Sequence, residues 1–249
     1  MSLWNKIFEK HKEGKKGKLA WLGCDMHNHV LPGIDDGAKT VADSLVLIQG
    51  LKDLGIDRCI ATPHVISGVY DNTVDDIAEA LGRLKQELTS KNMEFSIGHS
   101  AEYMLDEGFL NILDHNRLCA LPNNYVLIEM SYLAESNMLM EAIFRLQSEG
   151  YFPILAHPER YNYYHQDFNQ YKIIKEMGAL LQLNVLAISG YYGNQVKLTA
   201  ARLIKEGMYD FVGTDMHHER HLNAIKGVVD RYDVEALLKH NPIKNATAF

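Results

Sequence analysis

Short apolar runs of strand length alternate with amphipathic helical patterns along most of this chain. Helices between successive strands are typical of βα units and of a mostly parallel sheet. The pattern predicts seven strands, near residues 20–25, 58–62, 94–99, 125–130, 152–156, 180–184 and 210–214. An open doubly wound sheet has the same alternation, so periodicity alone leaves it open beside a barrel.

The clearest helix is predicted to begin at Thr73. Asp76 stands three residues later, which is the spacing of a capping box. The apolar positions that follow are expected to face the sheet: Val74, Ile77, Ala78, Leu81, Leu84 and Leu88. Several helices are predicted to end at a glycine, because glycine takes the left-handed cap conformation without steric cost: Gly55, Gly150, Gly178 and Gly207.

Composition indicates one catalytic domain over residues 19–249, preceded by a basic extension over residues 1–18. The chain has 249 residues, 47% of them apolar, which suffices for one sizeable core. The extension carries six lysines and is amphipathic, with two interpretations open: weak contact with an anionic membrane surface, or a short helix docked on the domain. Because the whole chain has a net charge of -7, the domain is acidic, which argues against nucleic acid as a partner.

No apolar run has the length needed to span a bilayer, and the N-terminus lacks the pattern of a secretory signal, so we expect a cytoplasmic location. The three cysteines, Cys24, Cys59 and Cys119, are too scattered for a disulfide framework or a zinc clip. We interpret them as small buried hydrophobic residues. None is followed by the arginine of a Cys-x5-Arg phosphate loop, which excludes that class of phosphatase.

Residues able to bind metals follow nearly every predicted strand. In barrels, catalytic groups converge where the strands end, so this placement favours a barrel with a metal site at that rim. The set combines imidazoles and carboxylates without cysteine, which suits Mn²⁺, Fe²⁺ or Zn²⁺ in a catalytic site. Bridging carboxylates would allow two or three cations. The candidates are His27, His29, Asp36, His64, Glu102, Glu129, His157, Asp215 and His217.

The other histidines lack this context, and we interpret His11, His99, His115, His165 and His240 as structural or exposed. His218 and His221 flank the last motif; they either orient ligands or lie on the surface. Five tyrosines fall on two predicted rim loops, where they either wall a phosphotyrosine pocket or pack on the domain: Tyr161, Tyr163, Tyr164, Tyr191 and Tyr192.

The motifs resemble those of the bacterial manganese-dependent tyrosine phosphatases of capsular and exopolysaccharide synthesis, in the polymerase and histidinol phosphatase superfamily. The opening motif, DMHNHVLPGIDDGAKT at residues 25–40, carries the resemblance most specifically. It continues through ATPH at 61–64, AEY at 101–103, LIEM at 127–130, AHPERY at 156–161 and GTDMH at 213–217.

This resemblance implies a distorted (β/α)7 barrel with up to three Mn²⁺ ions. One ion would be held by His27, His29, Glu102 and Asp215, a second by Glu102, Glu129 and His157, and the third by Asp36, His64 and His217. It implies that Arg160 binds the substrate phosphate. A second arginine follows the final histidine in the family, and Arg220 is the candidate here.

The expected activity is hydrolysis of phosphotyrosine in proteins by in-line attack of a metal-bridging hydroxide. By the resemblance, the substrate is the tail of a membrane tyrosine kinase that controls polysaccharide export. Two alternatives stay open: a small-molecule phosphatase of the histidinol-phosphate kind, and a non-catalytic metal-binding scaffold. The sequence leaves the oligomeric state open, a homo-oligomer included.

Overall fold

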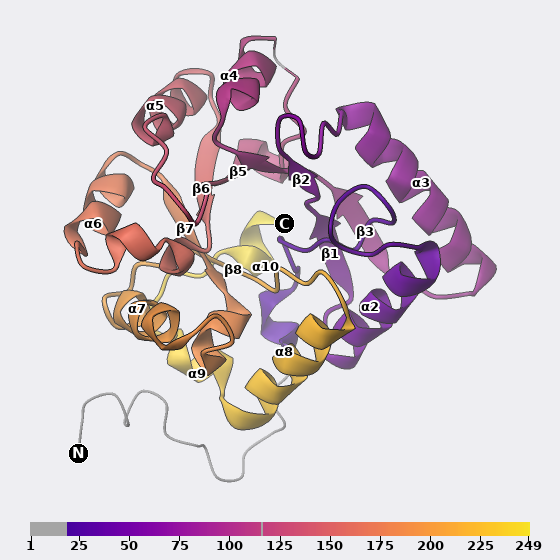
Figure 1. The fold of residues 1–249 in the computed structure, drawn as a ribbon. Helices are drawn as coiled ribbons and strands as arrows, with labels where there is room; N and C mark the ends of the chain where they lie inside the picture. The colour runs from indigo at the N-terminus through magenta and orange to yellow at the C-terminus, as the bar shows by residue number, and fades with distance from the viewer. Residues whose placement is uncertain (1–18, 116) are drawn as a thin grey trace.

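The computed structural model describes residues 19–115 and 117–249. The prediction of a basic amphipathic extension concerns residues 1–18, which lie outside the described residues. Figure 1 shows a curled array of strands in the middle of the molecule, with the longer helices around its outside. This arrangement confirms an α/β fold built on a parallel sheet.

Every strand pairing in the described part of the chain is parallel. β1 (Arg58–Ala61) pairs with β3 (Ser96–His99). The larger sheet has the order β2-β4-β5-β6-β7-β8. Its strands are β2 (His64–Val65), β4 (Glu102–Met104), β5 (Tyr125–Glu129), β6 (Phe152–Ala156), β7 (Leu180–Asn184) and β8 (Phe211–Gly213).

The predicted first strand at residues 20–25 is wrong. A 3-10 turn occupies Ala20–Leu22, and the chain then reverses at Gly23, whose φ is 67°. The apolar run reflects the burial of Leu22 and Cys24 in the core rather than sheet pairing. The segment after it makes only isolated parallel bridges, from Asp25 to Cys59 and from Asn28 to Met216.

The predicted runs at 58–62 and 94–99 correspond to β1 and β3, and each is followed after a break by a second short strand that lies outside the predicted range. β1 and β3 end at Ala61 and His99, and the pairing resumes as β2 with β4. Pro63 lies in the first break, and its missing N–H cannot take part in a strand ladder. The resumed pairing aligns His64 directly with Glu102.

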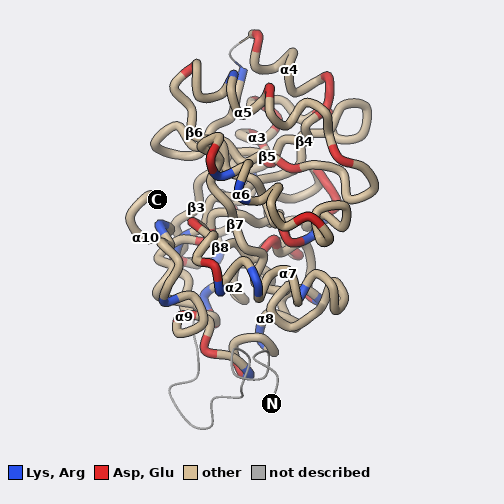
Figure 2. Tube along the Cα trace, turned by 90° about the vertical axis from the view of Figure 1, so that its left-hand side faces the viewer, with Lys and Arg blue, Asp and Glu red and all other residues tan. Residues whose placement is uncertain are grey.

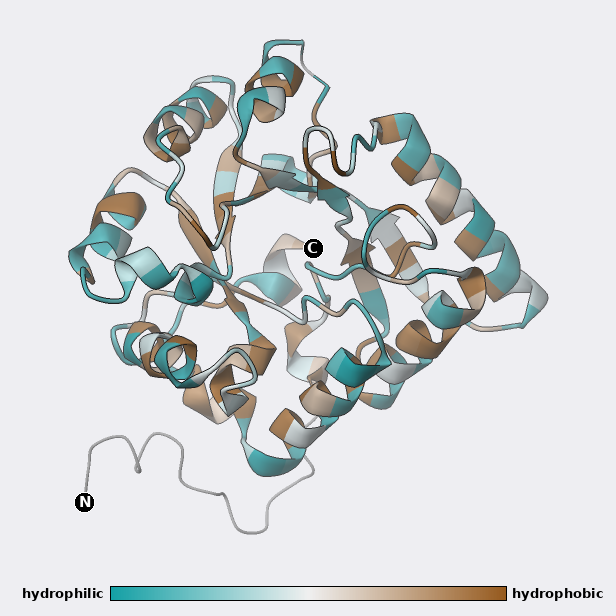
Figure 3. Cartoon of the chain, viewed as in Figure 1, coloured by the Kyte–Doolittle hydropathy of each residue, from teal (hydrophilic) through white to brown (hydrophobic). Residues whose placement is uncertain are grey.

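Most of the helices lie between strands. They are α2 (Val41–Asp53), α3 (Val74–Ser90), α4 (Glu107–Asp114), α5 (Leu139–Ser148), α6 (Asn169–Glu176), α7 (Asn194–Lys205), α8 (Glu219–Arg231), α9 (Val234–Leu237) and α10 (Asn245–Ala248). Their apolar stripes and polar faces are visible in Figure 3. None of the helices in the described part of the chain is both long and apolar enough to cross a membrane.

The capping box predicted for α3 is confirmed. The Thr73 side chain accepts from the Asp76 N–H, and the Asp76 side chain accepts from the Thr73 N–H. Ile77, Leu81, Leu84 and Leu88 are buried, as expected, and each contributes about 1.5–3 kcal/mol through burial. Val74 and Ala78 are exposed instead. Ala80 takes the buried position, because the helical period places it one turn from Ile77 and Leu84.

The four predicted helix-ending glycines all have positive φ, between 67° and 94°. Each lies two residues beyond the last helical residue of α2, α5, α6 or α7. The three cysteines are free and buried, as predicted. Acidic and basic positions are interspersed along the described trace in the view of Figure 2.

Candidate metal centre

The nine candidate metal ligands converge on one cluster, although they come from points spread along the chain. Glu102 begins β4 and Glu129 ends β5, while His157 and Asp215 follow β6 and β8. His27 comes from the extended segment after Gly23. Side-chain contacts link every member to at least one other: His27, His29, Asp36, His64, Glu102, Glu129, His157, Asp215 and His217.

Glu102 stands at the centre of the cluster and is fully buried. Its Oε2 lies 3.2 Å from His27 Nε2, 3.4 Å from His29 Nε2 and 3.2 Å from His64 Nδ1. Its other oxygen, Oε1, lies 3.0 Å from His157 Nε2. A carboxylate that faces four imidazoles has the position of a bridging ligand between cations.

Asp215 completes the innermost group. Its Oδ1 lies 3.4 Å from Nε2 of both His27 and His29. Together with Glu102 these residues offer ligand atoms that all lie within 4.8 Å of one another, and all are buried. This is the ligand set that the family resemblance implies for one metal.

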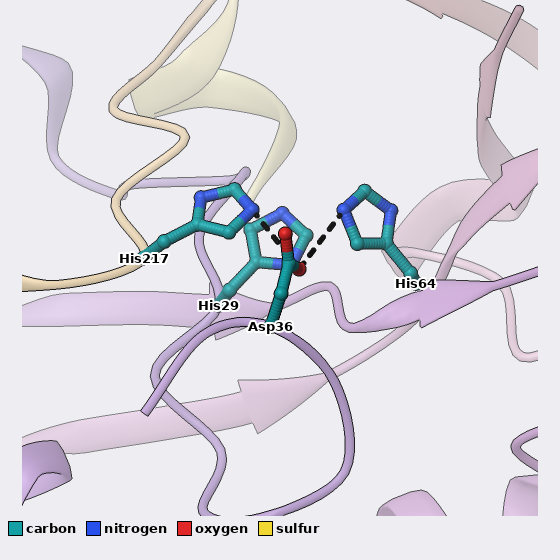
Figure 4. Close-up of side chains that lie close together, drawn as sticks. All are labelled: His29, Asp36, His64 and His217. Atoms are coloured by element: carbon teal, nitrogen blue, oxygen red, sulfur yellow. Dashed lines mark ion pairs between the residues drawn. The ribbon is translucent and has the colours of Figure 1, made fainter. Parts of the chain in front are cut away.

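A second group lies at the outer edge. Figure 4 shows the Asp36 carboxylate between the imidazoles of His64 and His217, with His29 behind it. Asp36 Oδ1 lies 3.5 Å from Nε2 of both His64 and His217. Its side chain is half exposed, so this group faces solvent. Asp36, and not its neighbour Asp35, is the aspartate of the opening motif that belongs to this candidate group.

Glu129 lies between two imidazoles. Its Oε1 is 2.9 Å from His64 Nδ1, and its Oε2 is 3.9 Å from His157 Nε2. Glu102, Glu129 and His64 form a compact candidate group, whereas the resemblance implied His157 in that place. Both imidazoles reach the Glu102–Glu129 pair.

Unsatisfied buried atoms are concentrated in this cluster. Among the described side chains, seven buried polar atoms make no hydrogen bond of acceptable geometry, and four of them belong to this cluster: His64 Nδ1, Glu102 Oε2, Glu129 Oε1 and His157 Nδ1. His64 Nδ1 faces the Glu102 oxygen at 3.2 Å and the Glu129 oxygen at 2.9 Å, as ligands of a shared cation would. A buried polar atom without a partner costs about 1–3 kcal/mol. Imidazole nitrogens and carboxylate oxygens left in this way fit divalent transition metals, since these metals take such donors.

Backbone conformation at two candidate ligands is also unusual. His157 has φ 33° and Asp215 has φ 49°, in the left-handed region that side chains disfavour. The other described non-glycine residues with positive φ are asparagines, which tolerate it: Asn92, Asn123 and Asn124. Strain of this kind costs on the order of 1–3 kcal/mol and concentrates at functional sites.

The buried carboxylates and imidazoles of the cluster shift one another's pKa values. Burial lowers the pKa of His27, but Glu102 and Asp215 outweigh it and raise the pKa to about 9. Burial raises the pKa of Glu102, but His27 and His64 outweigh it and hold that pKa well below its usual value. Burial and the nearby His29 lower the pKa of His217 to about 3. Cations in this cluster would therefore compete with protons.

Side chains behind the cluster fix its imidazoles, and the sequence analysis did not single them out. Asp35 Oδ2 lies 2.8 Å from His29 Nδ1, and Gln182 Oε1 lies 2.8 Å from His27 Nδ1. Each contact leaves Nε2 of the same ring facing Glu102 and Asp215. A partner on the second ring nitrogen is typical of metal-binding histidines. The doubled aspartate in the opening motif was the available signal for Asp35.

Arg160 lies at the edge of the cluster between two aromatic rings. Its guanidinium is 4.1 Å from the centre of the Tyr132 ring and 4.2 Å from that of Tyr192. Its NH1 donates to Asp215 Oδ2 at 3.0 Å. Asn184 donates to the same Asp215 oxygen and to the Tyr192 hydroxyl. The guanidinium is thereby fixed beside the candidate metal ligands.

Of the five tyrosines on the predicted rim loops, some pack on the domain and others lie at the site. Tyr161 and Tyr164 are buried and pack in the core. Tyr163 is partly buried and bonds the backbone of Ser131. Tyr192 lies against Arg160, and Tyr191 is exposed beside it.

Arg220 is exposed near the N-terminal end of α8. With Asp36 and His217 it lines a cavity of about 310 Å³. His221 Nδ1 accepts from the His217 N–H, and His218 caps α8. This geometry fits the interpretation that these two histidines orient the last motif. His99 and His165 are partly buried and His115 and His240 exposed, whereas His11 lies outside the described residues.

Comparison with known proteins places the chain in a family. Residues 23–241 match the family model described as "Capsular polysaccharide synthesis, CpsB/CapC". The chain is 30% identical over 200 residues to the tyrosine-protein phosphatase YwqE of Bacillus subtilis, covering 80% of this chain and 79% of that protein.

Solved structures agree with this match. The chain superposes with a TM-score of 0.76 and 28% identity on a structure reported for YwqE from Bacillus subtilis and CpsB from Streptococcus pneumoniae, described as unique metal-dependent tyrosine phosphatases; the match covers 88% of this chain and 96% of that one. The histidinol phosphate phosphatase of Lactococcus lactis shares the fold at a TM-score of 0.51 and 13% identity, over 83% of this chain and 92% of that one. The chain therefore belongs to the CpsB/CapC family of capsular polysaccharide synthesis.

Proposed function

We propose that this protein is a metal-dependent phosphotyrosine-protein phosphatase that acts in the control of capsular or exopolysaccharide synthesis. The observation that carries the proposal is the convergence of buried imidazoles and carboxylates on Glu102, with Arg160 fixed at their edge. Its relatives named as tyrosine-protein phosphatases support the substrate class.

Up to three divalent cations would be held by this cluster, and we propose Mn²⁺, with Fe²⁺ or Zn²⁺ as alternatives. The inner ion would take His27, His29, Glu102 and Asp215. The others would share the remaining candidates: Asp36, His64, Glu129, His157 and His217. Such ions supply an activated water and neutralise charge on phosphoryl oxygens.

The protein's own groups have separate roles in this proposal. Glu102 holds the ligand groups together, since it faces four imidazoles. Arg160 binds phosphate oxygens with its planar fork. The stacking of Tyr132 and Tyr192 on Arg160 orients that fork. Arg220, exposed beside Asp36, is proposed as a second phosphate contact.

A thiol nucleophile does not fit the site. Burial raises the pKa of Cys24 to about 12 and that of Cys119 to about 11, so neither is a thiolate at neutral pH. Cys59 is also buried, and its pKa is raised by burial. Free buried cysteines suit a reducing compartment, in keeping with the proposed cytoplasmic location.

We propose that residues 19–249 form one catalytic domain with the distorted (β/α)7 barrel of the superfamily, preceded by the extension over residues 1–18. The parallel bridges from Asp25 to Cys59 and from Asn28 to Met216 support closure, since they join the segment after Gly23 to β1 on one side and to the stretch that follows β8 on the other. Asp25 strengthens the join, because its carboxylate accepts from the N–H and the hydroxyl of Thr214.

The physiological substrate is proposed to be the phosphotyrosine tail of a membrane kinase for polysaccharide export. The activity is tested with protein stripped by a chelator and reloaded with Mn²⁺ or Mg²⁺. We expect hydrolysis of a phosphotyrosine peptide only after reloading, with Mn²⁺ preferred. Faster turnover of histidinol phosphate would favour a small-molecule phosphatase, and metal binding without any turnover would favour a scaffold.

A further inference from the structure

Three exposed apolar side chains lie on loops around the metal centre. Val69 is 64% exposed, Leu133 is 95% exposed and Tyr191 is 45% exposed. Val69 follows β2, Leu133 follows β5 and Tyr191 follows β7. Single exposed apolar residues are common on protein surfaces, so exposure alone does not indicate a function. The argument rests on the location of all three on loops that carry residues of the site.

Each of the three is the chain neighbour of an aromatic residue that contacts the site. Tyr70, next to Val69, stacks on His64 with the two ring centres 6.0 Å apart. Tyr132, next to Leu133, lies over Arg160, and so does Tyr192, next to Tyr191. Since neighbouring Cα atoms are about 3.8 Å apart, the backbone of each exposed residue lies next to an aromatic residue that contacts the site.

We propose that Val69, Leu133 and Tyr191 form an apolar rim that binds the residues flanking the phosphotyrosine of a protein substrate and prefers apolar side chains there. The inference rests on the proposed phosphatase function. A phosphate held beside Arg160 leaves the tyrosine ring pointing outward, so the flanking residues come to the loops that carry the rim. An apolar flanking residue that covers these side chains removes their apolar area from water.

The surface beyond Val69 leaves room for an extended chain. Residues of the loop after β2, including Ser67 and Asp71, form one side of a cavity of about 840 Å³. Val65, Ile77 and Phe109 contribute apolar lining to it. Val69 lies between Ser67 and Asp71 along the chain, so a polypeptide that contacts Val69 comes next to residues that line this cavity. A small phosphate ester bound at the metal centre would not extend to it.

The test uses the full chain loaded with Mn²⁺ and two phosphotyrosine peptides of equal length and charge. One peptide has leucine on both sides of the phosphotyrosine, and the other has serine. The test variant is Val69→Ser with Leu133→Ser. The matched control is Phe144→Ser, since Phe144 is 67% exposed but belongs to the middle of α5 rather than to a rim loop. p-Nitrophenyl phosphate serves as the substrate without flanking residues.

We expect wild type and Phe144→Ser to prefer the leucine peptide equally, by the ratio of kcat/KM values. The double variant should lose about ten-fold of that preference, which corresponds to about 1.4 kcal/mol. An unchanged preference in the double variant, or an equal loss in Phe144→Ser, overturns the rim.

Light scattering of the same proteins measures their oligomeric state and so tests whether a second copy of the chain covers the apolar rim. Dissociation of an oligomer in the double variant alone would make this surface an interface between copies and overturn the proposal. If wild type hydrolyses p-nitrophenyl phosphate but neither peptide, the proposed protein-phosphatase function fails first, and the rim fails with it.

Discussion

Replacing Asp35 by asparagine should weaken metal binding without touching a candidate ligand. Asp35 Oδ2 lies 2.8 Å from His29 Nδ1 and accepts from the His64 N–H at 3.1 Å. Its Oδ1 accepts from the Gly37 N–H at 2.8 Å. Asp35→Asn keeps the shape of the side chain but removes its charge, so the hydrogen bond that fixes the His29 ring changes from a charged one to a neutral one.

The magnitude follows from the change of a charged hydrogen bond into a neutral one. A bond to a charged group contributes about 1.5–3 kcal/mol, and one between neutral groups about 0.5–1.5 kcal/mol. The difference of roughly 1–1.5 kcal/mol corresponds to about ten-fold in affinity, and groups behind metal ligands typically change affinity by about 10–100-fold. We therefore expect Mn²⁺ to bind Asp35→Asn about 10–100-fold more weakly.

The assay is competition for Mn²⁺ against a fluorescent chelator at fixed pH. Asp76→Asn is the matched control, because Asp76 also accepts backbone and side-chain hydrogen bonds but caps α3 on the surface. That variant should keep wild-type affinity. Wild-type affinity in Asp35→Asn, or an equal loss in Asp76→Asn, would refute the role assigned to Asp35.

Three further predictions concern packing, the arginine and pH. Gly37→Ala should lower Tm, because the added Cβ would lie 2.2 Å from the His29 carbonyl oxygen and overpacking costs about 1–3 kcal/mol. Gly82→Ala should raise Tm, because the added Cβ has no atom within 4 Å and alanine favours the helix. Calorimetry that finds no difference in Tm between the two variants would contradict this. Tyr132→Ala should weaken inhibition by inorganic phosphate several-fold, since the cation–π contact of Tyr132 with Arg160 contributes about 0.5–2 kcal/mol. Tyr132→Phe keeps this contact and should keep the wild-type inhibition constant. Equal inhibition of the two variants would count against the stacking role. The pKa of His27 is raised from 6.5 to about 9, so its proton stabilises the metal-free fold below pH 6.5, and this contribution is lost as pH rises through 9. Bound Mn²⁺ would displace that proton, so calorimetry in two buffers should find proton release at pH 7 and tighter Mn²⁺ binding as pH rises. Mn²⁺ binding that does not depend on pH would contradict this.

The middle of the fold was predictable because burial there leaves a simple pattern. The run at 152–156 is continuous and apolar, and the run at 180–184 is apolar except for Gln182 and Asn184; they match β6 and β7 residue for residue. β2 and β4 have two and three residues, too few for any periodicity to appear. The apolar run at 20–25 predicted a false strand, because a 3-10 turn that buries Leu22, followed by the buried Cys24, has the same apolar composition.

The candidate ligands were predictable for a related reason. In a parallel sheet the carboxyl ends of the strands meet at one edge, so polar residues that follow successive strands are brought together. The roles of three other residues depend on how the chain places their side chains against a ring or a guanidinium. These residues are Asp35 beside His29, Gln182 beside His27 and Tyr132 over Arg160. These features depend on tertiary packing, and apart from the doubled aspartate that includes Asp35, the sequence has no pattern that indicates them.

The most direct test of the account is an anomalous difference map from a crystal of the full chain soaked in Mn²⁺, recorded at the manganese edge. We predict at least two peaks in the cluster, with the carboxylate of Glu102 between them. A map without peaks there, in a crystal where His27, His29 and Asp215 still face Glu102, would contradict the assignment of this cluster as a catalytic metal centre.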